Sequence, residues 1–175
     1  MQVRRSLIDK FWFYIYSLPI VTQLWARLNF NRITEDKKNE IPFTPLQKPL
    51  QYCKVALITT GGIHPNTVKA FDMDNPEGDS SFREIAKDID LNEIEITHNY
   101  YNHSDAEKDL NIIFPLQHFR DLEEKGIIGN LASVHYSFMG HINGEQLIQL
   151  ITKTISDVVN QLKQEGVDVV FLTPA

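Results

Sequence analysis

Apolar residues gather in four segments of the chain that have the length and pattern of β-strands. Residues 55–58 form an uninterrupted apolar run, which is typical of a strand covered on both faces. Residues 93–97 alternate between polar and apolar side chains and predict a strand nearer the edge of the same sheet. Residues 131–139 predict a third strand, and residues 167–172 predict a fourth that is buried.

The segments between these strands carry helix signals. Ser104 and Glu107 match a capping box, which predicts a short helix that starts at Asp105. Pro115 suits the first turn of the next helix, where its missing N–H costs nothing, and Gly126 marks the C-terminal end of that helix.

The longest helix is predicted after the third strand. Asn143 and Gln146 form a second capping box, and Gly166 ends the helix. Apolar side chains recur between these ends at helical spacing and share one face. They are Leu147, Ile148, Ile151, Ile155, Val158, Val159 and Leu162.

Strands that alternate with helices over residues 52–175 predict an α/β domain. We expect a Rossmann-like or flavodoxin-like, three-layer, mainly parallel sheet with right-handed crossovers. Residues 1–30 are rich in aromatic side chains and predict an N-terminal helical extension, whereas the proline-punctuated residues 31–51 predict an extended linker. We expect the domain to be truncated at its C-terminus, because the last predicted strand has no helix after it.

Composition describes an ordinary water-soluble domain with 42% apolar and 23% charged residues and a mean hydropathy of -0.26. The net charge of -6 argues against nucleic acid as a partner, since phosphate binding needs a clustered basic face. Cys53 is the one cysteine, so an internal disulfide and a cysteine-rich zinc site are excluded and the cytoplasm is the expected compartment. The apolar run of residues 11–21 is too short for a transmembrane segment.

Polar residues and glycines follow the predicted strands at their carboxyl ends. In a parallel sheet these ends lie at one edge, where α/β proteins bind ligands. We therefore expect residues 59–64, 98–103, 137–141 and 173–175 to form a single rim. Most of the histidines lie in or beside these segments.

The remaining histidines and the acidic loop receive structural interpretations. His118 lies on the helix that begins near Pro115 and is expected at the surface, while His135 lies within a strand and is expected to be a hydrogen-bonded core residue. Residues 71–81 combine turn formers with three aspartates. They lack the spacing and terminal glutamate of a calcium loop, which favours a solvated turn.

Clustered histidines could bind zinc or iron, transfer protons near neutral pH, or bind an anionic carboxylate. Their spacing does not choose between these roles. No HExxH helix is present, so a metal site is possible but not favoured, and acid–base work or substrate orientation is the stronger hypothesis. No GxGxxG or P-loop follows any strand, and Cys53 lies at the opposite edge of the sheet from the rim.

Four segments together carry a resemblance to a known family: KVALITTGGIHP, ITHNYYNHSDAEKDLNIIFP, SVHYSFMGHI and GVDVVFLTPA. Over about residues 53–175 the sequence resembles the glycine/sarcosine/betaine reductase selenoprotein B and D-proline reductase family. The resemblance implies reductive cleavage of a C–N bond in glycine, sarcosine, betaine, D-proline or a related small amine. It also implies other reductase subunits and a thiol reductant as partners.

In that family a redox-active selenocysteine or cysteine follows the last of these strands. The resemblance therefore implies a selenocysteine or cysteine just after Ala175, with no cofactor in the chain itself. A UGA selenocysteine codon taken as a terminator would explain where the sequence stops. Whether the chain is an enzyme by itself is open, and we expect it to be inactive alone.

Joined to the predicted rim, the resemblance assigns provisional roles. His64 and His141 are the first candidates to bind the substrate carboxylate or to protonate the leaving amine, with His98 as a further catalytic candidate. Tyr100 and Tyr101 would cap the pocket or face a partner, although ordinary packing explains them equally well. The predicted substrate-binding residues are Thr60, Gly61, Gly62, Tyr100, Tyr101, His103, Ser137, Met139, Gly140 and Thr173.

Two other functions stay open. The rim could hold a small ligand or another subunit without chemistry, or it could belong to a metal-dependent hydrolase. The aromatic N-terminal segment also points to a homo-oligomer.

Overall fold

The computed structural model describes residues 44–175. The helical extension predicted for residues 1–30, and most of the linker predicted for residues 31–51, lie outside the described residues. Residues Leu46–Ala175 form one compact unit, which carries all the elements discussed below.

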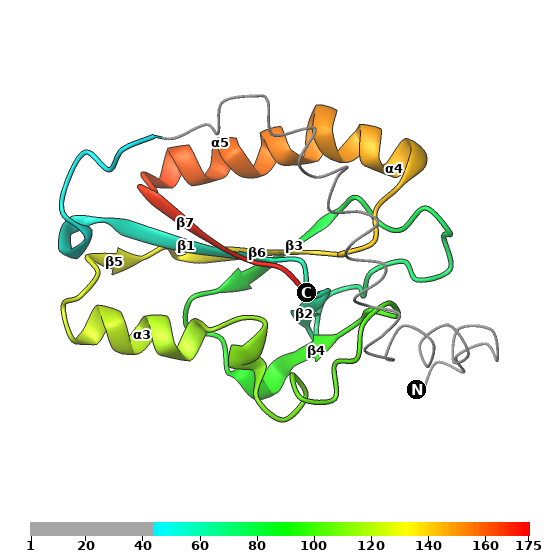
Figure 1. Ribbon diagram of the computed structural model, residues 1–175, viewed down its shortest axis with the longest axis horizontal. Helices are drawn as coiled ribbons and strands as arrows, with labels where there is room; N and C mark the ends of the chain where they lie inside the picture. Colours follow the sequence, from blue (N-terminus) through cyan, green and yellow to red (C-terminus); the bar gives the residue numbers. More distant parts are fainter. Residues whose placement is uncertain (1–43) are drawn as a thin grey trace, which may run out of the picture. The chain divides into compact units, whose positions relative to one another are not determined.

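The main sheet is built around β1, Lys54–Thr59, and confirms the α/β class (Figure 1). On one side β1 pairs in parallel with β7, Val169–Thr173, along most of its length. On the other side its two ends pair in parallel with β5, Asn130–Leu131, and with β6, Val134–Phe138. β3, Phe82–Ala86, runs antiparallel to β6 and was not foreseen from the sequence.

The predicted strand 131–139 is divided between β5 and β6, and a side chain bridges the gap. The backbone N–H of Leu57 faces the break and donates to Nδ1 of His135 at 3.1 Å. Because an unpaired buried N–H is costly, this imidazole replaces a missing backbone acceptor. His135 is fully buried, which confirms its prediction as a hydrogen-bonded core residue.

A second, smaller sheet contains two short antiparallel strands, β2, Ile63–Pro65, and β4, Ile94–Ile96. The prediction that residues 93–97 lie at the edge of the main sheet was therefore wrong. The chain leaves β1 at Gly61 and Gly62, and the φ of +66° at Gly62 turns it toward β4. The N–H of Thr97 then donates to the carbonyl of Gly62 at 2.8 Å, which holds β4 beside β2.

Helix α3 occupies Leu116–Glu124 and ends before Gly126, whose φ is +67°, as predicted. His118 on α3 is exposed, also as predicted. The short helix predicted from Asp105 is absent from the described chain, where residues 104–108 form only hydrogen-bonded turns. Between residue 44 and α3, short 3₁₀ segments are found at Leu50–Tyr52, Leu91–Glu93 and Leu110–Ile112.

The predicted long helix consists of α4, Gly144–Gln149, a π-helical segment, Leu150–Thr154, and α5, Ile155–Glu165. Its predicted capping box was wrong, because the Asn143 side chain makes no capping hydrogen bond. Instead the carboxylate of Glu77 accepts from the N–H of Glu145 at 3.0 Å.

Gln146, the other residue of the predicted capping box, forms its hydrogen bonds with Ser80. The side-chain oxygen of Gln146 accepts from the N–H of Ser80 at 3.1 Å and from its hydroxyl at 2.7 Å. The loop of residues 71–81 thus supplies both the cap and the anchor for the start of α4. At the other end Gly166 adopts a φ of +74° and ends the helix, as predicted.

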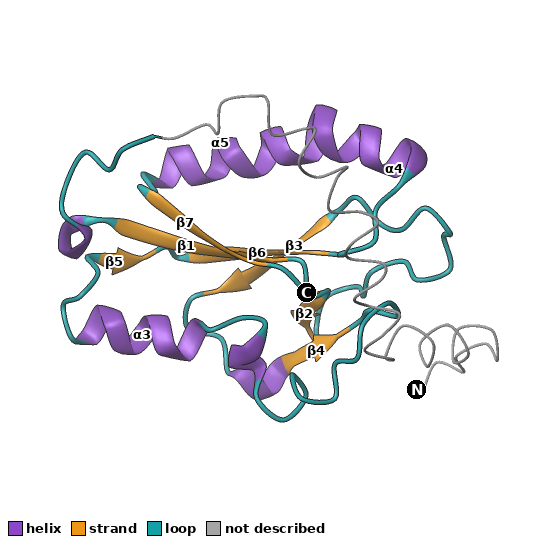
Figure 2. Cartoon of the chain, viewed as in Figure 1, coloured by secondary structure: helices purple, strands orange, loops and turns teal. Residues whose placement is uncertain are grey.

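The elements form three layers (Figures 1 and 2). α4 and α5 cover one face of the main sheet, and α3 with the β2–β4 sheet covers the other. Apolar side chains fill both interfaces, with Val158 and Leu162 of α5 in one core and Leu57 of β1 in the other.

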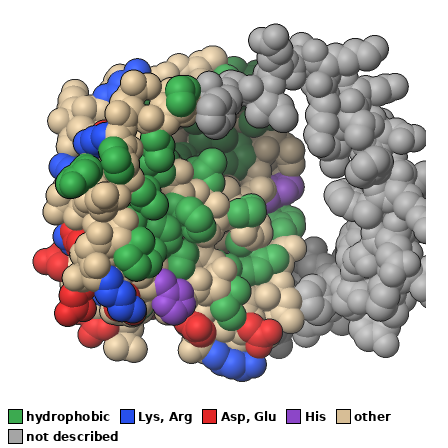
Figure 3. Space-filling view, turned by 60° about the vertical axis from the view of Figure 1, so that its left-hand side comes forward, with side chains coloured by type: hydrophobic (Ala, Val, Ile, Leu, Met, Phe, Trp, Pro, Cys, Tyr) green, Lys and Arg blue, Asp and Glu red, His purple; other side chains and the backbone are tan. Residues whose placement is uncertain are grey.

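Hydrophobic side chains are also exposed on the face shown in Figure 3. Of the seven apolar positions predicted on one helix face, only Val158 and Leu162 are buried. Ile151, within the π-helical segment, is 59% exposed. β7 was predicted to be buried, but Leu172 is 67% exposed, because β7 pairs within the described chain only with β1.

Within residues 44–175, none of the helices is long and apolar enough to cross a membrane.

Candidate functional site

The carboxyl ends of β1, β6 and β7 meet at one edge of the main sheet. The N–H of Thr60 donates to the carbonyl of Thr173 at 3.1 Å, and the N–H of Gly62 donates to the carbonyl of Phe138 at 3.0 Å. The N–H of Ala175 donates to Oγ1 of Thr60 at 3.0 Å. Three of the four predicted segments therefore lie together, because the parallel strands end at the same level.

Gly140 brings the fourth segment to this rim. A Cβ atom at Gly140 would lie 2.8 Å from Nε2 of His98, 3.1 Å from the carbonyl oxygen of Ala175 and 3.2 Å from that of Thr60. No larger residue fits there without moving its neighbours. The loop with His98 reaches the rim from the end of β4 in the small sheet, and not from the main sheet as predicted.

His98 is the most buried residue of the loop at residues 98–103, with 5% of its surface exposed. The N–H of Tyr100 points at its Nδ1 at 3.0 Å, and the N–H of Gly140 points at its Nε2 at 3.2 Å. Burial, with smaller contributions from the nearby His103 and His141, lowers the pKa of His98 to about 4. The imidazole is therefore neutral at pH 7.

The two tyrosines of the loop have different environments. Tyr101 donates its hydroxyl hydrogen bond to the carbonyl of Gly61 at 3.0 Å, and its ring centroid lies 4.6 Å from that of His98. Burial, with a contribution from Glu107, raises the pKa of Tyr101 to about 12. Tyr100 is 54% exposed and stacks on the ring of His141 at 4.1 Å. Tyr101 therefore fixes the loop, whereas Tyr100 presents a ring to solvent.

His141 is half-buried and is held through one ring nitrogen. Its Nε2 lies 3.0 Å from the carbonyl oxygen of Pro76, which can only accept, so Nε2 carries the hydrogen. The side-chain nitrogen of Asn143, 3.4 Å from the same atom, is then a contact and not a hydrogen bond. In this tautomer Nδ1 bears the lone pair that can accept a proton.

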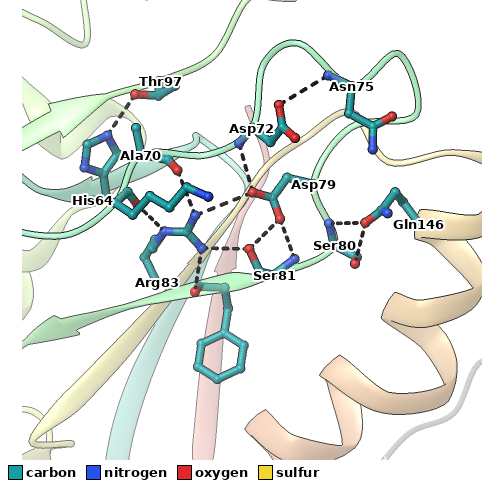
Figure 4. Close-up of polar contacts among 12 residues, drawn as sticks. His64, Ala70, Asp72, Asn75, Asp79, Ser80, Ser81, Arg83, Thr97 and Gln146 are labelled. Carbon is teal, nitrogen blue, oxygen red and sulfur yellow. Dashed lines mark hydrogen bonds and ion pairs between the residues drawn. The ribbon is translucent and has the colours of Figure 1, made fainter.

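His64 is 2% exposed, and both of its ring nitrogens are engaged; Figure 4 shows the contact with Thr97. Nδ1 donates to the carbonyl of Pro65 at 2.9 Å, and Nε2 accepts from the hydroxyl of Thr97 at 2.8 Å. The ring also makes an edge contact with Phe71, with centroids 6.3 Å apart. These partners join β2 to the start of the His98 loop, so the geometry of His64 is that of a bracing residue.

The other predicted site residues lie around this group. His103 contacts Glu107, with 2.6 Å between Nδ1 and Oε1. Ser137 and Met139 are buried, and the hydroxyl of Ser137 has no hydrogen-bond partner among residues 44–175. Thr173 is half-buried, and its hydroxyl lies 3.4 Å from the carbonyl oxygen of Ile58.

Arg83 is a buried charge that sequence reasoning missed (Figure 4). Its guanidinium donates to the carbonyls of Lys69 at 2.7 Å and Ala70 at 3.0 Å, and it lies 3.5 Å from the carboxylate of Asp79. It therefore ties the loop before β3 to the sheet. An arginine at an inward position of an alternating FREIA segment was the available signal.

The aspartates of the loop at residues 71–81 accept hydrogen bonds from backbone N–H groups of the same loop. Asp79 accepts from the N–H groups of Asp72 at 2.9 Å and Ser81 at 2.8 Å, and Asp72 accepts from Asp74 at 3.0 Å. Partial burial raises the pKa of Asp79, but these bonds and Arg83 outweigh it and leave the pKa below its ordinary value. A polar hollow of about 520 Å³ lies beside this loop. In the described part of the chain, three or more His, Cys, Asp or Glu residues nowhere form a group that could hold a metal ion.

Comparison with known proteins agrees with the resemblance seen in the sequence. The family model of glycine/sarcosine/betaine reductase selenoprotein B matches residues 29–175. The chain belongs to this family. All four segments that carried the resemblance fall within the matched residues, and their ends form the rim described above.

Relatives in the reductase family include components that act on different substrates. The chain is 37% identical over 131 residues to the D-proline reductase subunit gamma of Acetoanaerobium sticklandii, an alignment that covers 75% of this chain and 52% of that subunit. It is 33% identical over 111 residues to the sarcosine reductase complex component B subunit beta of Peptoclostridium acidaminophilum, covering 58% of this chain and 24% of the relative.

A third relative is the glycine reductase complex component B subunit gamma of Carboxydothermus hydrogenoformans. It is 30% identical over 141 residues, which cover 77% of this chain and 31% of the relative. The chain thus spans from about a quarter to about half of the length of these reductase components. No solved structure was found to match it.

Proposed function

We propose that this chain forms part of the active site of a reductase that cleaves the C–N bond of a small amine or amino acid. Its family supports the reaction class, since the relatives are named as glycine, sarcosine, betaine and D-proline reductase components. The observation that carries the proposal is the position of Ala175, hydrogen-bonded to Thr60 and next to Gly140 and His98.

The reactive group in this proposal is a selenocysteine or cysteine that follows Ala175. A side chain there would lie at the rim, beside the backbone of Gly140 and the ring of His98. A helix that starts directly after it would lower the pKa of the thiol or selenol and favour the nucleophilic anion. Reading the codon after Ala175 tests this directly: UGA or a cysteine codon is expected, and an ordinary stop with no coding sequence beyond it would contradict the proposal.

His141 is our candidate for the group that protonates the leaving amine. Its Nε2–H is anchored on Pro76 and its ring is stacked on Tyr100, which holds the ring in one orientation. Imidazole is the side chain most often used for proton transfer, and Nδ1 is the nitrogen left for it. His64 has both nitrogens occupied and is assigned a bracing role beside Thr97.

The test is a thiol-dependent reduction assay with glycine, sarcosine, betaine and D-proline. It uses a polypeptide that includes the residue after Ala175, together with the other reductase subunits. His141→Gln should lower kcat by about 100-fold or more, because a positioned acid typically contributes that much. His118→Gln, at an exposed position on α3, is the matched control and should leave kcat unchanged. Equal rates for the two variants would remove His141 from the mechanism.

A non-catalytic binding or subunit-interaction module is the second candidate. It is favoured by exposed apolar side chains on β7 and on the π-helical segment between α4 and α5, such as Leu172 and Ile151. Ligand affinity without turnover in the assay above would select it. The metal-dependent hydrolase has less support, and elemental analysis of the purified protein tests it.

We also propose the finer features that the family and fold suggest. Parallel pairing of β1 with both β6 and β7 supports a Rossmann-like or flavodoxin-like sheet. Relatives named as complex components and subunits support other reductase subunits as partners. A cytoplasmic site of action rests on the single cysteine of the sequence. Self-association stays a prediction that light scattering after size-exclusion chromatography measures.

A further inference from the structure

The tautomer of His141 is set by a loop from a distant part of the chain. Its Nε2 atom lies 3.0 Å from the carbonyl oxygen of Pro76, which is 65 residues away in the sequence. Because a carbonyl oxygen only accepts, Nε2 carries the hydrogen and Nδ1 carries the lone pair. The position of this one backbone carbonyl therefore decides which nitrogen of His141 can take up a proton.

The turn of residues 75–78 places the Pro76 carbonyl. The N–H of Gly78 donates to the carbonyl of Asn75 at 3.0 Å, which closes the turn. The side-chain oxygen of Asn75 also accepts from the N–H of Glu77 at 3.0 Å. An asparagine side chain used in this way replaces a backbone acceptor and stabilises the turn.

The same turn pairs with the backbone that carries His141. Gly78 forms an antiparallel bridge with Ile142, and the N–H of Asn143 donates to the carbonyl of Glu77 at 2.8 Å. A Cβ atom at Gly78 would lie 1.8 Å from the carbonyl oxygen of His141 and 2.9 Å from its carbonyl carbon. Gly78 also has a φ of +86°, which favours glycine. A side chain at this position would therefore push the turn away from His141.

We propose that Gly78 and Asn75 are positioning residues for His141. Gly78 lets the turn lie against the backbone of His141, and Asn75 gives the turn the shape that directs the Pro76 carbonyl at Nε2. The turn thereby keeps His141 in the tautomer whose Nδ1 can accept a proton. The use of that proton in catalysis rests on the proposed function, whereas the fixed tautomer does not.

The turn is held in place on both sides. The carboxylate of Glu77 accepts from the N–H of Glu145 at the start of α4 at 3.0 Å. The carboxylate of Asp79, directly after the turn, accepts from the N–H of Ser81 at 2.8 Å. A histidine whose orientation is fixed in advance loses less entropy when it reaches the geometry of proton transfer.

The decisive variant is Gly78→Ala, and the measurement is the tautomer of His141 by ¹⁵N NMR of the chain of residues 1–175. We expect the hydrogen on Nε2 in the unchanged protein and a mixture of both tautomers in Gly78→Ala. Gly126→Ala is the matched control, because Gly126 also has a positive φ, +67°, but a Cβ atom there has nothing within 4 Å. It adds similar backbone strain without displacing a neighbour, so the tautomer of His141 should stay the same.

A second pair of variants keeps the test decisive if Gly78→Ala does not fold. Asn75→Ala removes the side-chain acceptor of the Glu77 N–H and should also populate the second tautomer. Asn75→Asp keeps an oxygen acceptor and should restore the hydrogen on Nε2. A hydrogen on Nδ1 in the unchanged protein would overturn the proposal. A single Nε2–H tautomer in both alanine variants, or in the one that folds, would overturn it as well.

The reduction assay adds a readout that structural damage alone would not produce. Gly78→Ala should lower kcat about tenfold or more and leave KM within about twofold, because displacing a catalytic group by about 1 Å costs up to about 100-fold. In the His141→Gln background, Gly78→Ala should cause no further loss of kcat, since the group that it positions is already gone. Additive losses would show that Gly78 acts on something other than His141.

The positioning role and the proposed function fail in different ways. If Gly78→Ala changes the tautomer but not kcat, His141 is not the proton donor and the positioning role stands. If kcat falls while the hydrogen stays on Nε2, the positioning role is lost and the reductase assignment stands. A complete complex without turnover would defeat the reductase assignment and leave the tautomer result unchanged.

Discussion

Acidification from pH 7 to pH 5 should destabilise the protein because of two buried histidines, His98 and His135. Burial lowers the pKa of each from 6.5 to about 4 in the folded state. Between these values the unfolded chain binds more protons than the folded one, so the free energy of unfolding falls as the pH falls. The contribution of these two histidines to the free energy of unfolding is fully present above about pH 6.5 and is lost progressively toward pH 4.

The size of the effect follows from the pKa difference. A shift from 6.5 to about 4 corresponds to about 3 kcal/mol for each imidazole. Between pH 7 and pH 5 about 2 kcal/mol of this should be lost per histidine. For His135 the physical cause is desolvation at a fully buried site, where Nδ1 is already committed to the N–H of Leu57.

The perturbation that isolates one histidine is His135→Asn. The asparagine side-chain oxygen can accept from Leu57 but does not titrate, so the loss of stability between pH 7 and pH 5 should shrink by about 2 kcal/mol. Urea unfolding at several pH values, followed by far-ultraviolet circular dichroism, measures this loss. His118→Asn, at an exposed position, should leave it unchanged.

Titration of the carboxylates contributes to the loss of stability in the unchanged protein and in both variants. This contribution therefore cancels when the three proteins are compared. If His135→Asn loses as much stability on acidification as the unchanged protein, His135 takes up its proton in the folded state near its ordinary pKa. The argument from burial would then be refuted.

Three further changes test packing and capping, each by urea unfolding at pH 7. Arg83→Met should cost about 3–5 kcal/mol, because it removes a buried guanidinium that donates to two backbone carbonyls and pairs with the partly buried carboxylate of Asp79; a loss below 1 kcal/mol would contradict a structural role. Glu77→Ala should cost about 1 kcal/mol by removing the cap of α4, and Glu77→Gln, which keeps an acceptor, should cost less. Leu57→Ala should cost about 2–5 kcal/mol, whereas Ile151→Ala, at 59% exposure, should cost no more than about 0.5 kcal/mol; comparable losses would mean that Ile151 is covered.

Local patterns in the sequence were sufficient to predict the central strands and the ends of several helices. β1 was predicted because an uninterrupted apolar run suits a strand between two layers, and glycines at the ends of α3 and α5 were predicted because only glycine adopts positive φ without strain. β3 was missed because Arg83 and Glu84 interrupt its apolar pattern. The burial of Arg83 depends on the carbonyls of Lys69 and Ala70, which no local pattern reveals.

The rim, too, was predicted only in part from the sequence. That residues 59–64, 137–141 and 173–175 meet follows from the sequence, since parallel strands bring their carboxyl ends to one edge. Which sheet carries the loop after residue 97 depended on the pairing of β4 with β2, which the chain enters through the positive-φ turn at Gly62. The sequence placed the histidines near one another but could not rank them.

The sequence by itself therefore determined the α/β class, the family and the rim, because strand pattern, glycine and motif are local properties of the chain. Only the tertiary structure decided the hydrogen-bond partners of the three histidines. Both ring nitrogens of His64 are hydrogen-bonded, whereas His141 bonds to the carbonyl of Pro76 through Nε2 alone. His98 has a backbone N–H directed at each of its ring nitrogens. These are properties of hydrogen-bond partners drawn from distant parts of the chain. A side chain's chemistry depends on those partners as much as on its own identity.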